Sequence, residues 1–210
     1  MKNKLLIATK NPAKLMDLKA VLSDERWEIV GLEDLRITVD VEETGKTFIE
    51  NAKIKAEFYG KMSGLLTLGD DGGFMIDYLR GEPGVKSKRW IGGVESSDEE
   101  LIAYAIERLK KVPEEKRQAS LNTALALFHP TAGHLHVVED RIYGTVADKP
   151  SKCRLPNYPF RSLLLIPELN NKYYDELTEE EHKVYNHRRR AAEQIKKFLT
   201  RLAARQVSNY

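Results

Sequence analysis

The stretch Lys4-Leu5-Leu6-Ile7-Ala8-Thr9-Lys10-Asn11-Pro12-Ala13-Lys14 places an apolar run directly before a helix-start signal. The apolar residues predict a buried strand over residues 4–9. Asparagine is a favoured N-cap, and proline is favoured at the first helical position because its missing N–H would have no helical partner there. Leucine and valine then recur at helical spacing as far as residue 22. The chain therefore begins with a strand that passes straight into a helix.

The remaining pattern alternates strands and helices and then becomes rich in strands. We expect further strands over residues 27–31, 65–69, 119–128, 134–138 and 163–166, with 143–146 extending the same sheet. We expect helices from Thr47 to Gly64, over residues 98–110 and over residues 186–204. This order predicts an α/β or α+β fold and is compatible with two lobes.

Composition excludes several classes of protein. The 210 residues include 34 Lys+Arg and 32 Asp+Glu, so the formal net charge is only +2, which argues against a polybasic nucleic-acid coat protein. The single cysteine, Cys153, cannot form an intrachain disulfide. No apolar run approaches the roughly 20 residues of a membrane helix, and the N-terminal one is too short for a signal peptide. These features predict a cytoplasmic protein.

The segment from Thr9 to Lys14 is the first candidate site. A strand that turns into a helix presents free backbone N–H groups and the positive end of the helix dipole, and both favour a phosphate. Lys14, one turn into the helix, adds positive charge. The alternative is an ordinary N-capped helix with solvated lysines.

The segment from Glu42 to Asn51 is the second candidate. Gly45-Lys46-Thr47 resembles part of a phosphate loop, but that motif requires a glycine five residues earlier, where Asp40 stands. What remains is a loop dense in carboxylates ahead of a helix, on which Asn51 and Lys55 share one face. The alternative is that the acidic residues only complement the helix dipole.

Two further segments with charged residues, 70–73 and 187–190, are candidate binding sites. Asp70-Asp71-Gly72-Gly73 follows a short apolar strand, at the kind of sheet edge where ligands bind, and Mg²⁺ commonly takes one or two carboxylates plus substrate phosphates. The alternative is an Asp-Gly turn. His187-Arg188-Arg189-Arg190 opens the last helix, where basic residues oppose the dipole unless an anion holds them. The alternatives are a solvated basic face or a minor RNA-binding surface.

Taken in order, these segments resemble the inosine triphosphate pyrophosphatase family, also called Ham1-like. Residues 8–14 are similar to its Thr-x-Asn-x-x-Lys, and residues 42–56 to its Glu-x-Gly-x-Thr-Phe-x-Glu-Asn-Ala-x-x-Lys-Ala box. Residues 70–74 look like Asp-Asp-Ser-Gly-Leu, residues 81–87 like Gly-x-Pro-Gly-x-x-Ser, and residues 186–188 like Ser-His-Arg. The resemblance covers residues 4 to about 200, and the order and spacing of the motifs make it specific.

The resemblance implies a fold and an activity. The fold is an elongated, two-lobed α/β mixed-sheet fold with the nucleotide in a cleft between the lobes, formed by residues 1–210 as one domain and usually present as a homodimer. The activity is Mg²⁺-dependent hydrolysis of non-standard purine nucleoside triphosphates (ITP, dITP, XTP) to the monophosphate and pyrophosphate. Neither a membrane nor a nucleic acid is an expected partner.

The resemblance also implies roles for individual residues. The triphosphate would be held by Thr9, Asn11 and Lys14, with support from Lys55. The metal would be served by Glu42 and Asp71, with Asp71 also the base for the attacking water. The nucleotide would be contacted by Gly72, His187 and Arg188.

One segment departs from the family pattern. Where the family has Gly-Phe-Gly-Tyr-Asp-Pro, this chain has residues 157–163, with Pro159 in place of the phenylalanine and Ser162 in place of the aspartate. Phe160 or Tyr158 remains able to stack on a purine, while the acceptor is lost. The lysine that usually precedes Ser-His-Arg is replaced by His182, next to Lys183. Two rival hypotheses follow: a pyrophosphatase with another base preference, and a nucleotide- or RNA-binding protein without catalysis.

Overall fold

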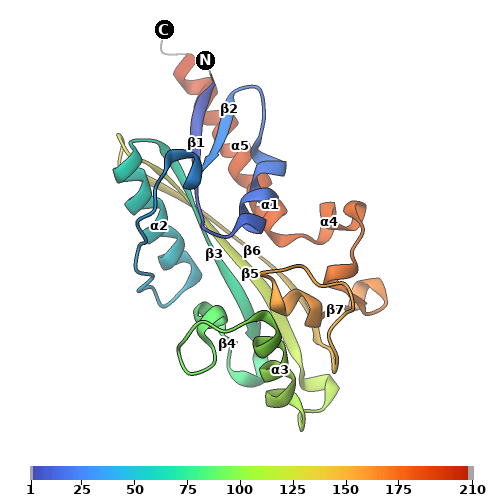
Figure 1. Cartoon of the computed structure of the whole chain (residues 1–210). Coiled ribbons are helices and arrows are strands. Elements are labelled where there is room, and N and C mark those ends of the chain that lie inside the picture. Colours follow the sequence, from blue (N-terminus) through green and yellow to red (C-terminus); the bar gives the residue numbers. More distant parts are fainter. Residues whose placement is uncertain (1, 208–210) are drawn as a thin grey trace. The chain divides into compact units, whose positions relative to one another are not determined.

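The computed structural model describes residues 2–207, with side chains as far as residue 202. The chain divides into two compact units. Figure 1 labels the helices and strands of the chain where there is room. Unit 1 consists of residues 2–71, 123–140 and 187–207, and unit 2 consists of residues 72–122 and 141–186. Three long strands contribute residues to both units, so three of the four unit boundaries fall inside strands, and the fourth lies between the last two helices.

The strands of the described chain form a mixed sheet of eight. They are β1 (Asn3–Ala8), β2 (Trp27–Gly31), β3 (Leu66–Ile76), β4 (Glu82–Pro83), β5 (Gln118–His129), β6 (His134–Val146), β7 (Leu164–Ile166) and β8 (Lys172–Tyr173). Their order is β2-β1-β3-β5-β6-β7-β8, and β4 pairs with β3. β1 is parallel to β2 and β3, whereas the β3–β4, β6–β7 and β7–β8 pairs are antiparallel. The protein therefore has a mixed α/β fold.

Four of the five helices described below begin at, or within one residue of, the position that the sequence predicts; α4 is the exception. The helices are α1 (Pro12–Leu22), α2 (Phe48–Ser63), α3 (Asp98–Leu109), α4 (Glu179–Tyr185) and α5 (His187–Val207). Asn11 caps α1, and Thr47 caps α2 through a capping box with Glu50. Short 3₁₀ helices, η1 to η7, join the other elements; η5 (Pro159–Leu163) and η7 (Tyr174–Glu176) both lie in unit 2. No helix in residues 2–207 is long and apolar enough to cross a membrane.

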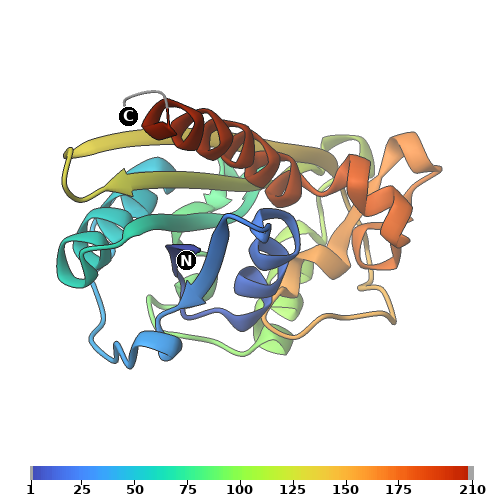
Figure 2. The ribbon, with the colours of Figure 1, turned by 90° about the horizontal axis from the view of Figure 1, so that it is seen from above.

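In unit 1, the side chains of β1 alternate between two sets of helices. Leu5 and Ile7 pack in the cluster that contains residues of α1 and α5, whereas Leu6 and Ala8 pack with Tyr59 of α2. Figure 2 shows α5 running beside strands of this unit. Successive residues of a strand point to opposite faces, so the parity of a residue decides which helices it meets. The same rule positions the charged residues of β3.

In unit 2, one hydrophobic cluster joins α3 to the strands and the 3₁₀ segments. It includes Phe74 and Ile76 of β3, Leu101 and Leu109 of α3, and Phe160 of η5. Phe74 and Phe160 stack with ring centroids 5.1 Å apart and an interplanar angle of 7°. The 3₁₀ segment that carries the altered motif is therefore anchored in the core of its unit.

Three expectations about elements need correction. β3 does not end before Asp70 but continues through Asp70-Asp71-Gly72-Gly73 to Ile76, because Phe74 and Ile76 bury their side chains in unit 2. Residues 134–146 form one strand and not two pieces. The helix α4 is not among the expected helices; its signal is the capping box between Thr178 and Glu181.

Candidate active site

The loop between β1 and α1 is fixed by its own side chains. The Oδ1 atom of Asn11 accepts hydrogen bonds from the backbone N–H groups of Ala13 and Lys14, at 2.9 and 3.2 Å. The Thr9 Oγ1 atom accepts from the N–H of Asn11 at 3.2 Å. Two of the free helical N–H groups are thus already bound. The side-chain amide nitrogen of Asn11 makes no hydrogen bond within residues 2–202, so it remains able to donate to a ligand.

Asp70 lies at the centre of a buried ion cluster in unit 1. Its carboxylate is fully buried, and the Nε atom of Arg188 donates to it at 3.0 Å. The Lys14 ammonium lies 3.5 Å from the same carboxylate, and the Thr123 hydroxyl donates to it at 3.3 Å. The Arg188 guanidinium also lies 3.9 Å from Asp17. Strand parity explains the partners, because Asp70 shares the face of Leu68, which packs with α1 and α5.

The cluster sets the protonation of its members. Burial alone would raise the pKa of Asp70, but the positive charges of Arg188, Lys14 and Lys55 outweigh it and lower the pKa. Burial lowers the pKa of Lys14, and Arg188 and Lys55 act in the same direction against the attraction of Asp70. The basic group at the start of α5 is therefore held by carboxylates of the protein itself. Arg190 follows the same pattern, since its Nε atom donates to Asp140 at 3.0 Å.

Asp71 meets the other face of the sheet, where α2 lies. The Asn51 amide donates to its Oδ2 atom at 3.1 Å, and the Lys55 ammonium donates to its Oδ1 atom at 3.4 Å. Asn51 and Lys55 are one helical turn apart, so the shared face predicted from their spacing is confirmed. The Lys55 ammonium also lies 3.2 Å from Glu43. Burial would lower the pKa of Lys55, but Asp71, Glu43 and Asp70 together raise it, so Lys55 remains a cation.

Two glycines allow this arrangement. A Cβ atom at Gly45 would lie 2.5 Å from the Asn51 Oδ1 atom, which accepts the Gly45 N–H at 2.8 Å. A Cβ atom at Gly69 would lie 2.1 Å from the carbonyl oxygen of Ala52 in α2. Both contacts are shorter than any side chain permits. The loop before α2 and the strand β3 therefore approach α2 at backbone distance.

Glu42 and Glu43 differ in their contacts. Glu43 forms the ion pair with Lys55, whereas Glu42 is exposed and has no ion pair or hydrogen bond within the residues whose side chains are described. In the Glu-x-Gly motif the glutamate two residues before Gly45 is Glu43, so the motif itself holds the signal for this residue. The role of Glu42 stays a prediction.

Comparison with known proteins identifies the family of this chain. The Ham1 family model matches residues 5–198. The chain belongs to the Ham1 family. It is 35% identical to a dITP/XTP pyrophosphatase of Thermus thermophilus over 188 residues, which cover 90% of this chain and 87% of that protein. It is 33% identical to the dITP/XTP pyrophosphatase of Bacillus subtilis over 195 residues, 92% of this chain and 96% of that protein.

Solved structures of Ham1 proteins have the same fold. The HAM1 protein of Coxiella burnetii superposes with a TM-score of 0.83 at 30% identity and covers 95% of this chain and 99% of its own. The Ham1 protein of Staphylococcus aureus gives a TM-score of 0.81 at 28% identity, covering 94% of this chain and 98% of its own. The expected fold class is thereby confirmed over nearly the whole chain.

The segment that departs from the Ham1 pattern has unusual contacts in unit 2. Phe160 is buried against Phe74 and meets the edge of Trp90 at 5.9 Å, so the expectation that its ring could stack on a purine is wrong. Tyr158 is only partly buried, and the Arg161 guanidinium lies 3.5 Å from its ring centre. Ser162 is fully buried and donates its hydroxyl hydrogen to the Pro159 carbonyl at 2.8 Å. Tyr158 is thus the aromatic ring of this segment that remains partly accessible.

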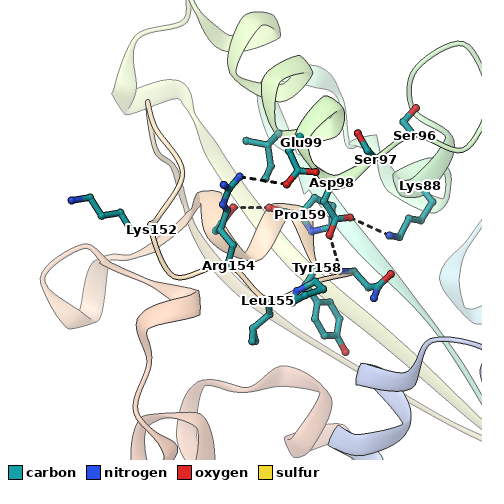
Figure 3. Close-up of a pocket in the computed structure, with 14 residues that line it drawn as sticks. Lys88, Ser96, Ser97, Asp98, Glu99, Lys152, Arg154, Leu155, Tyr158 and Pro159 are labelled. Carbon is teal, nitrogen blue, oxygen red and sulfur yellow. Dashed lines mark hydrogen bonds and ion pairs between the residues drawn. The ribbon is translucent and has the colours of Figure 1, made fainter.

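A pocket of about 640 Å³ borders this segment in unit 2, between the first turn of α3 and residues 152–162 (Figure 3). Asp98 accepts a hydrogen bond from the backbone N–H of Asn157 at 2.7 Å and pairs with Lys88 at 3.2 Å. Arg154 lies 3.9 Å from Glu99. Most charged side chains of the pocket wall form ion pairs with one another, so the wall is polar but its net electrostatic potential is small.

Two further predicted site residues, Gly72 and His187, lie in β3 and α5, and the residues at the replaced lysine lie in α4. Gly72 lies within β3, next to Asp71 and partly exposed. His187 is buried at the first position of α5. The ring of His182, which replaces the usual lysine, meets the Tyr174 ring at 5.6 Å, while Lys183 pairs with Glu180 on the surface of α4.

Sequence reasoning predicted Lys14 but missed two other members of the Asp70 cluster, Asp17 and Thr123. Asp17 and Lys14 lie at helical spacing on α1, a pattern that places both on the face toward Asp70. Thr123 gives no local signal, because only the pairing of strands brings it to Asp70.

Proposed function

We propose that this protein is a nucleoside triphosphate pyrophosphatase that hydrolyses dITP, XTP and ITP to the monophosphate and pyrophosphate. The observation that carries the proposal is the group of Asp71, Asn51, Lys55 and Glu43, in which a carboxylate and a buried cation are held side by side. The names of the Ham1 relatives support the same activity.

Mg²⁺ fits the residues at this place. The Lys55 ammonium bridges the carboxylates of Glu43 and Asp71 at 3.2 and 3.4 Å, so the position attracts positive charge. No group of three or more metal-ligating side chains is present within the described residues. Mg²⁺ commonly binds one or two carboxylates and completes its shell with substrate phosphates and water. We assign Asp71, with Glu42 or its neighbour Glu43, to the metal, which would polarise the phosphates and neutralise their charge.

The chain's own residues then have distinct tasks. The Asn11 amide nitrogen and the Lys14 ammonium bind the triphosphate, with Thr9 fixing their loop, and Lys55 offsets the negative charge of the transition state. Asp71 accepts a proton of the attacking water at a carboxylate oxygen. The water oxygen bonds to the α-phosphorus while the bond from that phosphorus to the bridging oxygen breaks. Pyrophosphate leaves with the electron pair of that bond. Gly72, His187 and Arg188 complete the nucleotide site.

The base preference is the part of the proposal that the altered segment bears on. Ser162 stands in place of the family's aspartate and is turned inward to Pro159, so it offers no exposed acceptor. This observation supports the alternative that the enzyme accepts bases other than hypoxanthine and xanthine. The RNA-binding alternative has less support, because Arg188 and Arg190 are paired with carboxylates of the protein.

The test is product analysis over a panel of dITP, XTP, ITP, ATP and GTP, with Mg²⁺ and with chelator. We expect monophosphate and pyrophosphate in equal amounts, and no turnover without a divalent cation. Release of orthophosphate, or no product from any triphosphate, would contradict the proposal. A rate for ATP or GTP equal to that for dITP would favour the broader base preference.

Assembly and location complete the proposal. We propose a homodimer of one catalytic domain per chain, which sedimentation equilibrium tests directly. The cytoplasmic location expected from the single Cys153 stays a prediction.

A further inference from the structure

Asp175 of η7 is a buried carboxylate that the proposed chemistry does not use. Neither of its oxygens is exposed, and neither has a hydrogen-bond partner within residues 2–202. The backbone N–H of Leu155 opposes the effect of burial on the pKa of Asp175. A buried carboxylate without hydrogen bonds lowers the stability of the folded protein, so a compensating role is expected for it.

The cation whose charge acts on Asp175 belongs to the altered segment. η5 packs against η7, and Arg161 of η5 is the positive group that attracts the Asp175 charge. The Arg161 side chain is 3% exposed, and its guanidinium lies 3.5 Å from the ring centre of Tyr158 and 5.4 Å from that of Tyr174. Arg161 therefore connects the buried carboxylate to the aromatic ring that remains partly accessible in this segment.

The other groups around Asp175 add little positive charge. Glu176, the next residue, is exposed and accepts a hydrogen bond from the Ser151 hydroxyl at 2.6 Å. His182 of α4 meets the ring of Tyr174, on the residue before Asp175. β7, which also packs against η7, consists of leucine and isoleucine. Arg161 is thus the cation whose position depends most directly on the Asp175 charge.

We propose that Asp175 is a positioning residue for substrate binding: its ionised carboxylate holds the Arg161 guanidinium against Tyr158, and protonation releases that hold. The proposal rests on the proposed function, because Tyr158 lies in the segment that replaces the family's base-reading motif. Arg161 itself is not assigned a contact with substrate.

The position of Asp175 makes this hold sensitive to pH near neutrality. Burial raises the pKa of Asp175 to about 7, with the charge of Glu176 acting in the same direction and Arg161 opposing it. The group is therefore mostly ionised at pH 8 and mostly neutral at pH 6. Because burial is the dominant cause, ionisation costs the folded state stability while it orders Arg161.

The first test compares the KM for dITP of wild type, Asp175→Asn and the neighbouring control Glu176→Gln at pH 6 and pH 8, with saturating Mg²⁺. Asparagine imitates the neutral acid, so the Asp175→Asn KM should exceed that of wild type by about fivefold at pH 8 and match it at pH 6. The kcat should stay within about twofold, since the phosphate site lies on other residues. Titration of the triphosphate itself affects all three proteins equally and cancels in the ratio.

The second test needs no activity and separates the failure of this proposal from failure of the proposed function. The wild type should lose stability relative to Asp175→Asn as pH rises from 3.8, the ordinary pKa of the group, toward about 7. The variant should therefore have the higher Tm at pH 8, and the Tm difference should narrow toward pH 4. In a Trp27→Phe background, the fluorescence of Trp90, which contacts Phe160, should change with a midpoint near pH 7 and lose that change in Asp175→Asn.

Three results would overturn the proposal. One is an Asp175→Asn protein that retains the wild-type pH dependence of KM. Another is a Tm that is equal to wild type, or lower, at pH 8. The third is loss of the pH dependence in Glu176→Gln, which would assign the effect to that carboxylate instead.

Discussion

Asp70 and Asp71 are consecutive residues of β3, but their carboxylates differ in burial and in the helices that supply their partners. Asp70 is fully buried, and Arg188, Lys14 and Thr123 bind it. Asp71 remains 11% exposed and shares its cation, Lys55, with a glutamate that is one-third exposed. The first carboxylate is satisfied inside the protein and joins β3 to α1 and α5. The second is held in place but keeps part of its surface exposed, as its proposed role toward a metal and a triphosphate requires.

The largest effect on activity is expected for Asp71→Asn, which tests whether Asp71 acts as the base. The variant keeps the shape and the place of the side chain but removes its ability to accept a proton. We expect kcat for dITP to fall by about a thousandfold, since a positioned base contributes roughly 10²–10⁴. Circular dichroism and Tm check that the fold is retained. The matched control is Asp77→Asn, an exposed aspartate that directly follows β3, and this variant should turn over dITP as wild type does.

Asp70→Asn should instead act on stability. It leaves the buried Arg188 and Lys14 without their shared counter-charge, and breaking a buried ion pair costs about 3 kcal/mol or more. Urea unfolding followed by fluorescence measures the change in the free energy of unfolding. A variant within about 1 kcal/mol of wild type, or one that is fully stable but inactive, would show that Asp70 belongs to the chemistry and not to the framework.

Glu42→Gln and Glu43→Gln test which of the two glutamates serves the metal beside Asp71. If Glu42 serves the metal, its amide variant should lose about a hundredfold in kcat/KM and require more Mg²⁺ for half-maximal rate. Glu43→Gln should lose only a few-fold, because Lys55 keeps its pair with Asp71. A Mg²⁺ titration of both variants decides between them. A larger loss for Glu43→Gln would transfer the metal role to that residue.

The smallest expected effect is the pH dependence of the Asp70 cluster. Because the folded pKa of Asp70 is below its ordinary value of 3.8, the cluster's contribution is fully present above that pH and is lost as pH falls through the lowered pKa. The stability difference between wild type and Asp70→Asn should therefore be constant from pH 5 to pH 8 and shrink below about pH 4. A difference that already narrows at pH 6 would contradict the lowered pKa.

Local signals predict much of the fold. The N-caps Asn11 and Thr47 and the left-handed Gly64 define the start of α1 and both ends of α2. The strand predicted over residues 27–31 has the observed bounds. These features depend on a few neighbouring residues and their backbone hydrogen bonds, which is why the sequence is sufficient to predict them.

The environment of each charge is harder to predict. Asp70-Asp71-Gly72-Gly73 resembles a turn by composition, and only the burial of Phe74 and Ile76 in another unit keeps it extended. The pairing of Asp70 with Arg188 joins residues 118 positions apart, and no periodic pattern encodes it. The accessibility predicted for Phe160 is wrong because its neighbours in the core lie far away in sequence. Long-range packing decides these points.

The close approach at Gly69 has a consequence for the evolution of the enzyme. Since a Cβ atom there would lie 2.1 Å from the Ala52 carbonyl oxygen, any other residue at this position would force α2 away from β3. The separation between the Lys55 ammonium and the Asp71 carboxylate is therefore inherited from the backbone.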